Sequence, residues 1–116
     1  MRSSPESKYV SLQRYFAYLN RSIDTLTKLV VFEPNGEELW RRVRSNIEAF
    51  LLTELQKGVL PARKPEQAFF VRCDRSTMTQ EDIDNGRLVV LVGVALLRPA
   101  EFVIVRIGQW TADHKP

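Results

Sequence analysis

The first periodic stretch predicts an amphipathic helix from Ser11 to about Lys28. Apolar residues recur there at alternating spacings of four and three positions, which lines one face of an α-helix: Leu12, Phe16, Leu19, Ile23 and Leu26. Basic residues fall on the opposite face at every seventh position, at Arg14, Arg21 and Lys28. Residues 1–8 are polar and are expected to form a flexible lead-in, and Tyr9–Leu12 a short extended segment.

A second helix is predicted after a turn at residues 33–36. The short run 29–32 has β-type composition, and Asn35 is placed as an N-cap, with Glu38 three residues later as in a capping box. Gly58 supplies the stop. Glu54 lies within the apolar arc and Leu52 on the polar side, so either side chain could mark a second contact surface.

The C-terminal half predicts strands. Residues 59–67 contain two prolines and form a loop, 68–73 form a compact strand, and Thr79 caps a helical turn over 80–84. Two apolar runs follow, on either side of Pro99, and Gly93 interrupts the first, where a bulge or close backbone approach is expected. The fold class is α+β: two helices on one face of a small, mainly antiparallel sheet of three to four strands. Residues 9–110 form one domain and 111–116 a tail.

The last apolar run carries more apolar side chains than an exposed edge strand tolerates. Its residues include Phe102, Val103, Ile104, Val105, Arg106, Ile107 and Trp110. Either helices of the same chain cover this strand, or it adds to the sheet of a neighbouring subunit, where main-chain hydrogen bonds supply affinity. The residues alone favour neither interpretation over the other.

Composition adds limits on function. The chain has 116 residues, 44% of them hydrophobic and 27% charged, and a formal net charge of +3, which alone is too weak to indicate nucleic acid. A single cysteine, Cys73, excludes an internal disulfide and indicates a reducing compartment. No run approaches the roughly 18 apolar residues of a membrane span, so we expect a cytoplasmic protein without a membrane partner.

No set of residues predicts catalysis. The only histidine, His114, lies near the end of the chain without a base or orienting partner, and Cys73 is expected in an inert strand position. The acidic segment 81–86 fails the calcium-loop pattern, because Gly86 falls where a ligand is needed. We therefore expect no enzymatic activity, no small-molecule substrate, no cofactor and no metal.

Several runs resemble the C-terminal domain of the tail sheath proteins of contractile injection systems and contractile-tailed phages. They occur in order and cover nearly the whole chain: Val30-Val31-Phe32-Glu33-Pro34-Asn35 with Leu39-Trp40, then Ala68-Phe69-Phe70-Val71-Arg72-Cys73-Asp74, then Asp82-Ile83-Asp84-Asn85-Gly86-Arg87, and Arg98-Pro99-Ala100-Glu101-Phe102-Val103-Ile104. The resemblance implies a structural protein whose subunits stack as rings around an inner tube and exchange strands through terminal arms. Residues 101–110 would correspond to the C-terminal arm.

The resemblance also implies partners and a location. Identical or homologous sheath subunits and an inner tube protein are expected, within an assembled phage tail or tail-like particle. Two basic sets are candidates for contact with an acidic tube: Arg14, Arg21 and Lys28, or Arg41, Arg42 and Arg44. Known sheath proteins are several times longer, so an excised domain, a truncated product or a capping or accessory protein are the alternatives. A nucleic-acid-binding module is disfavoured, because the sequence lacks interleaved exposed aromatic and basic residues.

Overall fold

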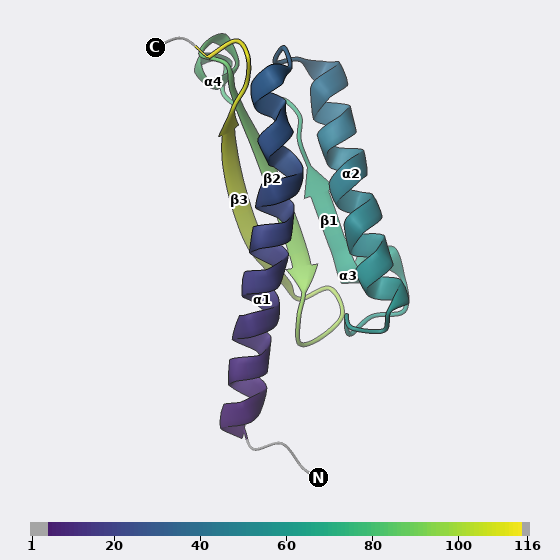
Figure 1. Cartoon of the computed structure of the whole chain (residues 1–116). Coiled ribbons are helices and arrows are strands. Elements are labelled where there is room, and N and C mark those ends of the chain that lie inside the picture. Colours follow the sequence, from purple (N-terminus) through teal and green to yellow (C-terminus); the bar gives the residue numbers. More distant parts are fainter. Residues whose placement is uncertain (1–4, 115–116) are drawn as a thin grey trace.

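A three-stranded antiparallel sheet carries two long helices on one face (Figure 1). The computed structural model describes residues 5–114. Its elements are α1 (Pro5–Thr27), the 3₁₀ helix η1 (Lys28–Phe32), α2 (Glu37–Gln56), α3 (Pro65–Ala68), β1 (Phe69–Arg72), α4 (Gln80–Asp84), β2 (Arg87–Ala95) and β3 (Phe102–Trp110). The sheet order is β1-β2-β3. The predicted α+β class, with both long helices on one face of the sheet, is confirmed.

The core lies between the central strand and the two helices. Alternate residues of β2 face the helices and are buried: Leu88, Val90, Val92 and Val94. They meet Leu19 and Ile23 of α1, and Leu39, Val43, Ile47 and Leu51 of α2. Strand β2 pairs with a strand on each side, and most of its side chains are buried on both faces. Its sequence is therefore a nearly continuous apolar run rather than an alternating one.

The connection between β2 and β3 is tied to the rest of the domain. Ala100 adopts a left-handed backbone conformation with φ of 62°, and its N–H donates to the carbonyl of Gln67 at 2.8 Å. The pairing of β2 with β3 runs without a bulge from Arg87 opposite Trp110 to Ala95 opposite Phe102. Gly93 instead provides the expected close approach, because a Cβ there would lie 2.0 Å from the Phe70 ring.

Two predictions at the N-terminal side are wrong. Helix α1 already begins at Pro5, so residues 5–8 and the segment from Tyr9 to Leu12 are helical; residues 1–4 lie outside the described part. The run 29–32 belongs to η1 and not to a strand. Only Val30 of η1 is buried, and a strand needs a paired neighbour that the three-stranded sheet does not offer there.

The helix caps are partly as predicted. Gly58 follows α2 with φ of +78° and donates to the carbonyl of Leu55 at 2.9 Å, and Thr79 forms a full capping box with Asp82. The N-cap of α2, however, is Gly36 without a side-chain hydrogen bond, not Asn35. Among the described helices, none is both long and apolar enough to span a bilayer.

Candidate subunit interface

Strand β3 is an edge strand of the domain's own sheet. All nine of its residues pair with β2, and within residues 5–114 no strand pairs with its other edge. Val103, Ile104 and Trp110 remain 41%, 50% and 44% exposed. The strand is therefore held by its own sheet while its outer main-chain edge is free of a β partner.

The two faces of β3 have different environments. Residues opposite the buried positions of β2 lie toward the helices, and one of them, Gln109, donates from its Nε2 to Asp24 Oδ1 and to Thr27 Oγ1, both at 2.9 Å. Val105 and Ile107 pack partly against the core on this side. Helix α1 thus covers one face of the strand, as the first of the two sequence interpretations requires, without covering its edge.

The opposite face of the sheet is rich in aromatic, aliphatic and arginine side chains. None of the three strands contains a lysine or an acidic residue. Phe70 and Phe102 meet edge to face at 5.1 Å across Gly93, and the guanidinium of Arg72 lies 5.5 Å from the Phe70 ring. Aromatic residues and arginine are enriched, and lysine and acids depleted, at the centres of protein interfaces, so this face has interface character.

The six basic candidates differ in their ion pairs. Lys28 lies 3.5 Å from Asp24, Arg42 lies 2.9 Å from Glu33, and Arg44 lies 3.8 Å from Glu48. The other three, Arg14, Arg21 and Arg41, are exposed and have no ion pair with the side chains of residues 10–114. All six belong to α1, η1 or α2, so they are carried by the helical layer.

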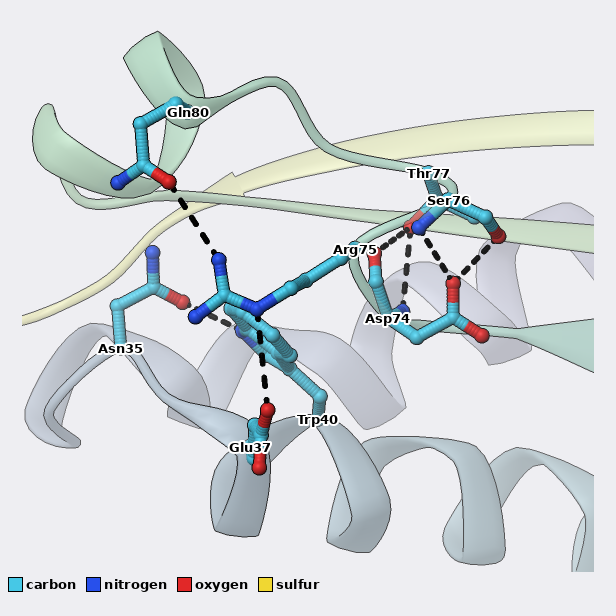
Figure 2. Close-up of polar contacts among 8 residues, drawn as sticks. All are labelled: Asn35, Glu37, Trp40, Asp74, Arg75, Ser76, Thr77 and Gln80. Carbon is cyan, nitrogen blue, oxygen red and sulfur yellow. Dashed lines mark hydrogen bonds and ion pairs between the residues drawn. The ribbon is translucent and has the colours of Figure 1, made fainter.

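A groove of about 470 Å³ lies between α2 and the turn after β1. Figure 2 shows Arg75 extended over the indole of Trp40, with its Nε 3.8 Å from Glu37 Oε1 and one terminal nitrogen 3.4 Å from Gln80 Oε1. Hydrogen bonds from Ser76 lower the pKa of Asp74, which therefore stays ionised. The groove is lined by side chains of both charges, and several of these side chains contact one another.

The cysteine in the groove is not a nucleophile at neutral pH. Cys73 lines it, but burial, together with the neighbouring Asp74 carboxylate, raises the pKa of this thiol to about 12. The thiolate needed for nucleophilic attack or metal binding is therefore absent near pH 7. Among residues 5–114, no group of three or more histidine, cysteine or acidic side chains is arranged to bind a metal ion. His114, which follows the C-terminal end of β3, is exposed and stacks on Trp110 with ring centroids 3.9 Å apart.

Comparison with known proteins decides the family. A family model described as the phage tail sheath C-terminal domain matches residues 2–109. This chain belongs to the phage tail sheath C-terminal domain family. The expected resemblance is thereby confirmed. Tail sheath proteins are structural proteins. No curated protein matches.

Two solved structures support the same family assignment. One is a cryo-EM structure of the anti-feeding prophage baseplate, with 40% sequence identity and a TM-score of 0.69; the other is the PVC sheath complex of an extracellular contractile injection system in its contracted state, with 42% identity and a TM-score of 0.68. Each comparison covers 83% of this chain and 27% of the solved chain. The sheath domain therefore spans about a quarter of the length of these relatives.

Residues from several of the family-like runs meet at Asn35 in the sheath domain. Asn35 Oδ1 accepts from Trp40 Nε1 at 2.7 Å, and its Nδ2 donates to the carbonyls of Arg87 and Ile83 at 3.3 and 3.5 Å. Its main-chain N–H donates to the carboxylate of Asp113 at 2.9 Å. This junction ties the start of α2 to the start of β2 and to the C-terminal segment. The sequence signal was read as a helix cap, so the tertiary role was missed.

The C-terminal segment of the sheath domain is also fixed through Thr111 and Ala112. Thr111 is 2% exposed, with its hydroxyl donating to the carbonyl of Gly86 at 2.7 Å, and the N–H of Ala112 donates to the carbonyl of Glu33 at 2.9 Å. Residues 111–114, expected to be a polar tail, are thus bonded to the domain, while 115–116 lie outside the described residues. This bonding fixes the end of β3 against its own fold.

The carboxylate of Glu54 makes its contacts within the sheath domain. It is 2% exposed and accepts from the Tyr15 hydroxyl at 2.9 Å and from Lys57 Nζ at 3.1 Å. Burial raises the pKa of Tyr15, and the Glu54 carboxylate raises it further. Leu52, by contrast, is 39% exposed on the outer side of α2. Of the two side chains that break the helical pattern, Glu54 is buried and Leu52 is exposed.

Proposed function

We propose that this chain acts as a sheath-type structural domain that joins neighbouring sheath subunits by strand addition at the outer edge of β3. The observation that carries the proposal is the free main-chain edge along the nine residues of β3. Two relatives at about 40% identity come from assembled contractile particles, which supports the same role. Function within an assembled phage tail or tail-like particle is part of this proposal.

The edge of β3 lacks the features that usually prevent strand addition. Natural edge strands are protected by prolines, bulges, lysines or short length. Strand β3 has nine residues, pairs without a bulge and carries one charged side chain, Arg106. The other edge strand, β1, has only four residues. The β3 edge is therefore the better site for a strand from a neighbouring subunit.

Strand addition by one short edge is a weak contact. A stable protein interface buries about 1,600 Å² in total, more than one added strand supplies, so the assembly must combine many repeated contacts. The domain is then monomeric when dilute and associates when concentrated. Growth beyond a dimer would support a sheath role, whereas association that ends at a dimer would support a capping role.

The helical layer is proposed to face an acidic inner tube. Arg14, Arg21 and Arg41 project from it without ion pairs to described residues, so their charges are available to a partner. Lys28, Arg42 and Arg44 are partly neutralised by their own acidic neighbours. Exposed charges of one sign mainly steer association and its salt dependence. Binding to a tube protein should therefore weaken when salt is added.

Sedimentation velocity over a range of protein concentrations tests strand addition. Ile104→Lys places a lysine at a half-exposed position of the β3 edge strand and should suppress association. Leu52→Lys, at a similarly exposed leucine on α2, is the matched control and should associate like the wild type. Circular dichroism confirms that both variants fold. Equal association of Ile104→Lys and the wild type would reject the proposal.

A further inference from the structure

The 3₁₀ helix η1 presents an apolar knob at one end of the molecule, formed by Leu29 and Phe32. These side chains are 72% and 79% exposed, the highest values among the large hydrophobic residues that are exposed. The knob is held in place, because Val30 is buried between them and Glu33 donates its N–H to the carbonyl of Val30 at 3.0 Å. Two large apolar side chains that are exposed to solvent on a backbone held in this way indicate a contact site.

An apolar end groove lies at the opposite end of the molecule. It has a volume of about 330 Å³ and is lined by Leu12, Leu96, Leu97, Glu101, Phe102 and Val103. Figure 1 shows η1 at the end of α1 that joins α2, and the loop between β2 and β3 at the other end of the sheet. The knob of one molecule therefore cannot reach the groove of the same molecule.

The groove is preformed by a constrained loop. Ala100, next in sequence to Glu101 of the lining, has a left-handed backbone conformation, which is uncommon for residues other than glycine and persists only where the surrounding structure holds it. The hydrogen bond from Ala100 to Gln67 supplies that restraint. Leu97 lines the groove, and its side chain remains 69% exposed.

We propose that identical domains associate end to end, with the knob of one copy in the end groove of the next. A second copy fits as the occupant because this chain itself carries the apolar knob that the groove would bury. Charge also agrees. Lys28 precedes the knob, and its pair with Asp24 at 3.5 Å is exposed and therefore weak enough to be exchanged for another carboxylate. Glu101, which has no ion pair among the described residues, lines the groove. Contacts between unlike surfaces of identical subunits repeat from copy to copy, so they form rows, which close into rings where the rotation between copies allows it.

This inference rests on the proposed association of sheath domains but names a different contact from strand addition: Phe102 and Val103 of β3 line the groove with their side chains, whereas strand addition uses the main-chain edge. Residues Leu29 and Phe32 belong to η1, so substituting them leaves every residue of the sheet unchanged. The two contacts can operate together in an assembly, one along the row and one across it. They can also be tested separately.

Disulfide trapping tests the end-to-end contact. The full chain carrying both Phe32→Cys and Leu97→Cys should give a ladder of dimers, trimers and longer species after mild oxidation at high concentration. The matched control carries Leu52→Cys with Leu97→Cys and should give at most a trace of dimer. Native Cys73 is buried and does not compete. A distribution identical to that of the control would overturn the proposal.

Loss of association provides a second readout. Leu29→Ser with Phe32→Ser should weaken self-association by about tenfold or more, as expected for removal of the central apolar anchors of an interface. Leu52→Ser, also an exposed leucine, is the control and should leave it unchanged. Unchanged association of the knob variant alongside loss in Ile104→Lys would reject the end contact and keep strand addition. The reverse result would keep the end contact and reject strand addition.

Discussion

Replacing Asn35 should reveal how much the junction at the start of α2 stabilises the domain. The Trp40 side chain is 3% exposed and its indole N–H has Asn35 Oδ1 as its acceptor at 2.7 Å. Asn35→Ala leaves this buried donor unsatisfied, which costs about 1–3 kcal/mol. The two longer bonds from Nδ2 to the carbonyls of Arg87 and Ile83 add less, because the carbonyls can bind water instead.

The expected total for Asn35→Ala is a loss of about 2–3 kcal/mol in the free energy of unfolding. For a domain of this size, that corresponds to a decrease of roughly 10–15 °C in the melting temperature. Urea denaturation followed by tryptophan fluorescence and circular dichroism measures the free energy directly. Asn35→Asp keeps an acceptor for the indole but turns a carboxylate oxygen toward the carbonyls of Arg87 and Ile83, so it should also destabilise the domain.

A double-mutant cycle with Trp40→Phe tests the assigned mechanism. Phenylalanine removes the indole N–H, so in that background Asn35→Ala should cost under about 1 kcal/mol, giving a coupling energy of at least ~1 kcal/mol. Followed by circular dichroism, the cycle does not depend on the fluorescence of Trp40. If Asn35→Ala costs the same in both backgrounds, or falls within about 0.5 kcal/mol of the wild type, the reasoning is refuted.

Three further predictions follow from other sites. Gly93→Ala should destabilise the domain by about 1–3 kcal/mol, since the new Cβ would enter the Phe70 ring. In urea titrations, adding Phe70→Leu should relieve part of that cost. If the free-energy losses of the two substitutions simply add in the double variant, the prediction is contradicted. The hydrogen bond from Thr79 N–H lowers the pKa of Asp82, so the stabilisation that the Asp82 carboxylate provides is present above about pH 4 and is lost as pH falls through the folded pKa. Asp82→Asn should therefore flatten the dependence of the urea midpoint on pH in that range. An unchanged slope would refute this prediction. Burial raises the pKa of Cys73 to about 12, so iodoacetamide should modify the folded protein far more slowly than the urea-unfolded protein at about pH 8, and equal rates would contradict the assignment.

Local pattern was sufficient for most of the fold. The spacing of apolar residues locates both long helices, and the runs on either side of Pro99 become β2 and β3. Thr79 and Gly58 are recognised as caps because their interactions lie within a few residues in sequence. The close approach at Gly93 follows from a local signal as well.

The errors arise where contacts distant in sequence decide the structure. Residues 29–32 have β-type side chains but no strand to pair with, so the chain turns in a 3₁₀ helix. Asn35 has the side chain of a cap, yet its partners lie as far away as Asp113, 78 residues along the chain. Glu54 can be buried because Tyr15, 39 residues earlier, donates to it. No pattern within one helix contains that information.

The candidate interface was predictable in composition but not in geometry. The excess of apolar residues in 102–110 pointed to a strand needing a partner, but sequence alone could not show that β2 and α1 satisfy one edge and one face and leave the other edge free. The basic residues were found by their spacing, while the ion pairs that neutralise Lys28, Arg42 and Arg44 appear only in the structure. The end groove combines α1 with a loop more than 80 residues later, so no local signal marked it.

Amide hydrogen exchange along β3 tests the central claim most directly. Alternate amides of an edge strand point toward its partner strand and away from it, so in a dilute sample protection from exchange should alternate from Phe102 to Trp110. At concentrations where the protein associates, the outward amides should become protected as well. Protection of every β3 amide in the dilute monomer, or rapid exchange of the outward amides in the associated state, would contradict strand addition at this edge.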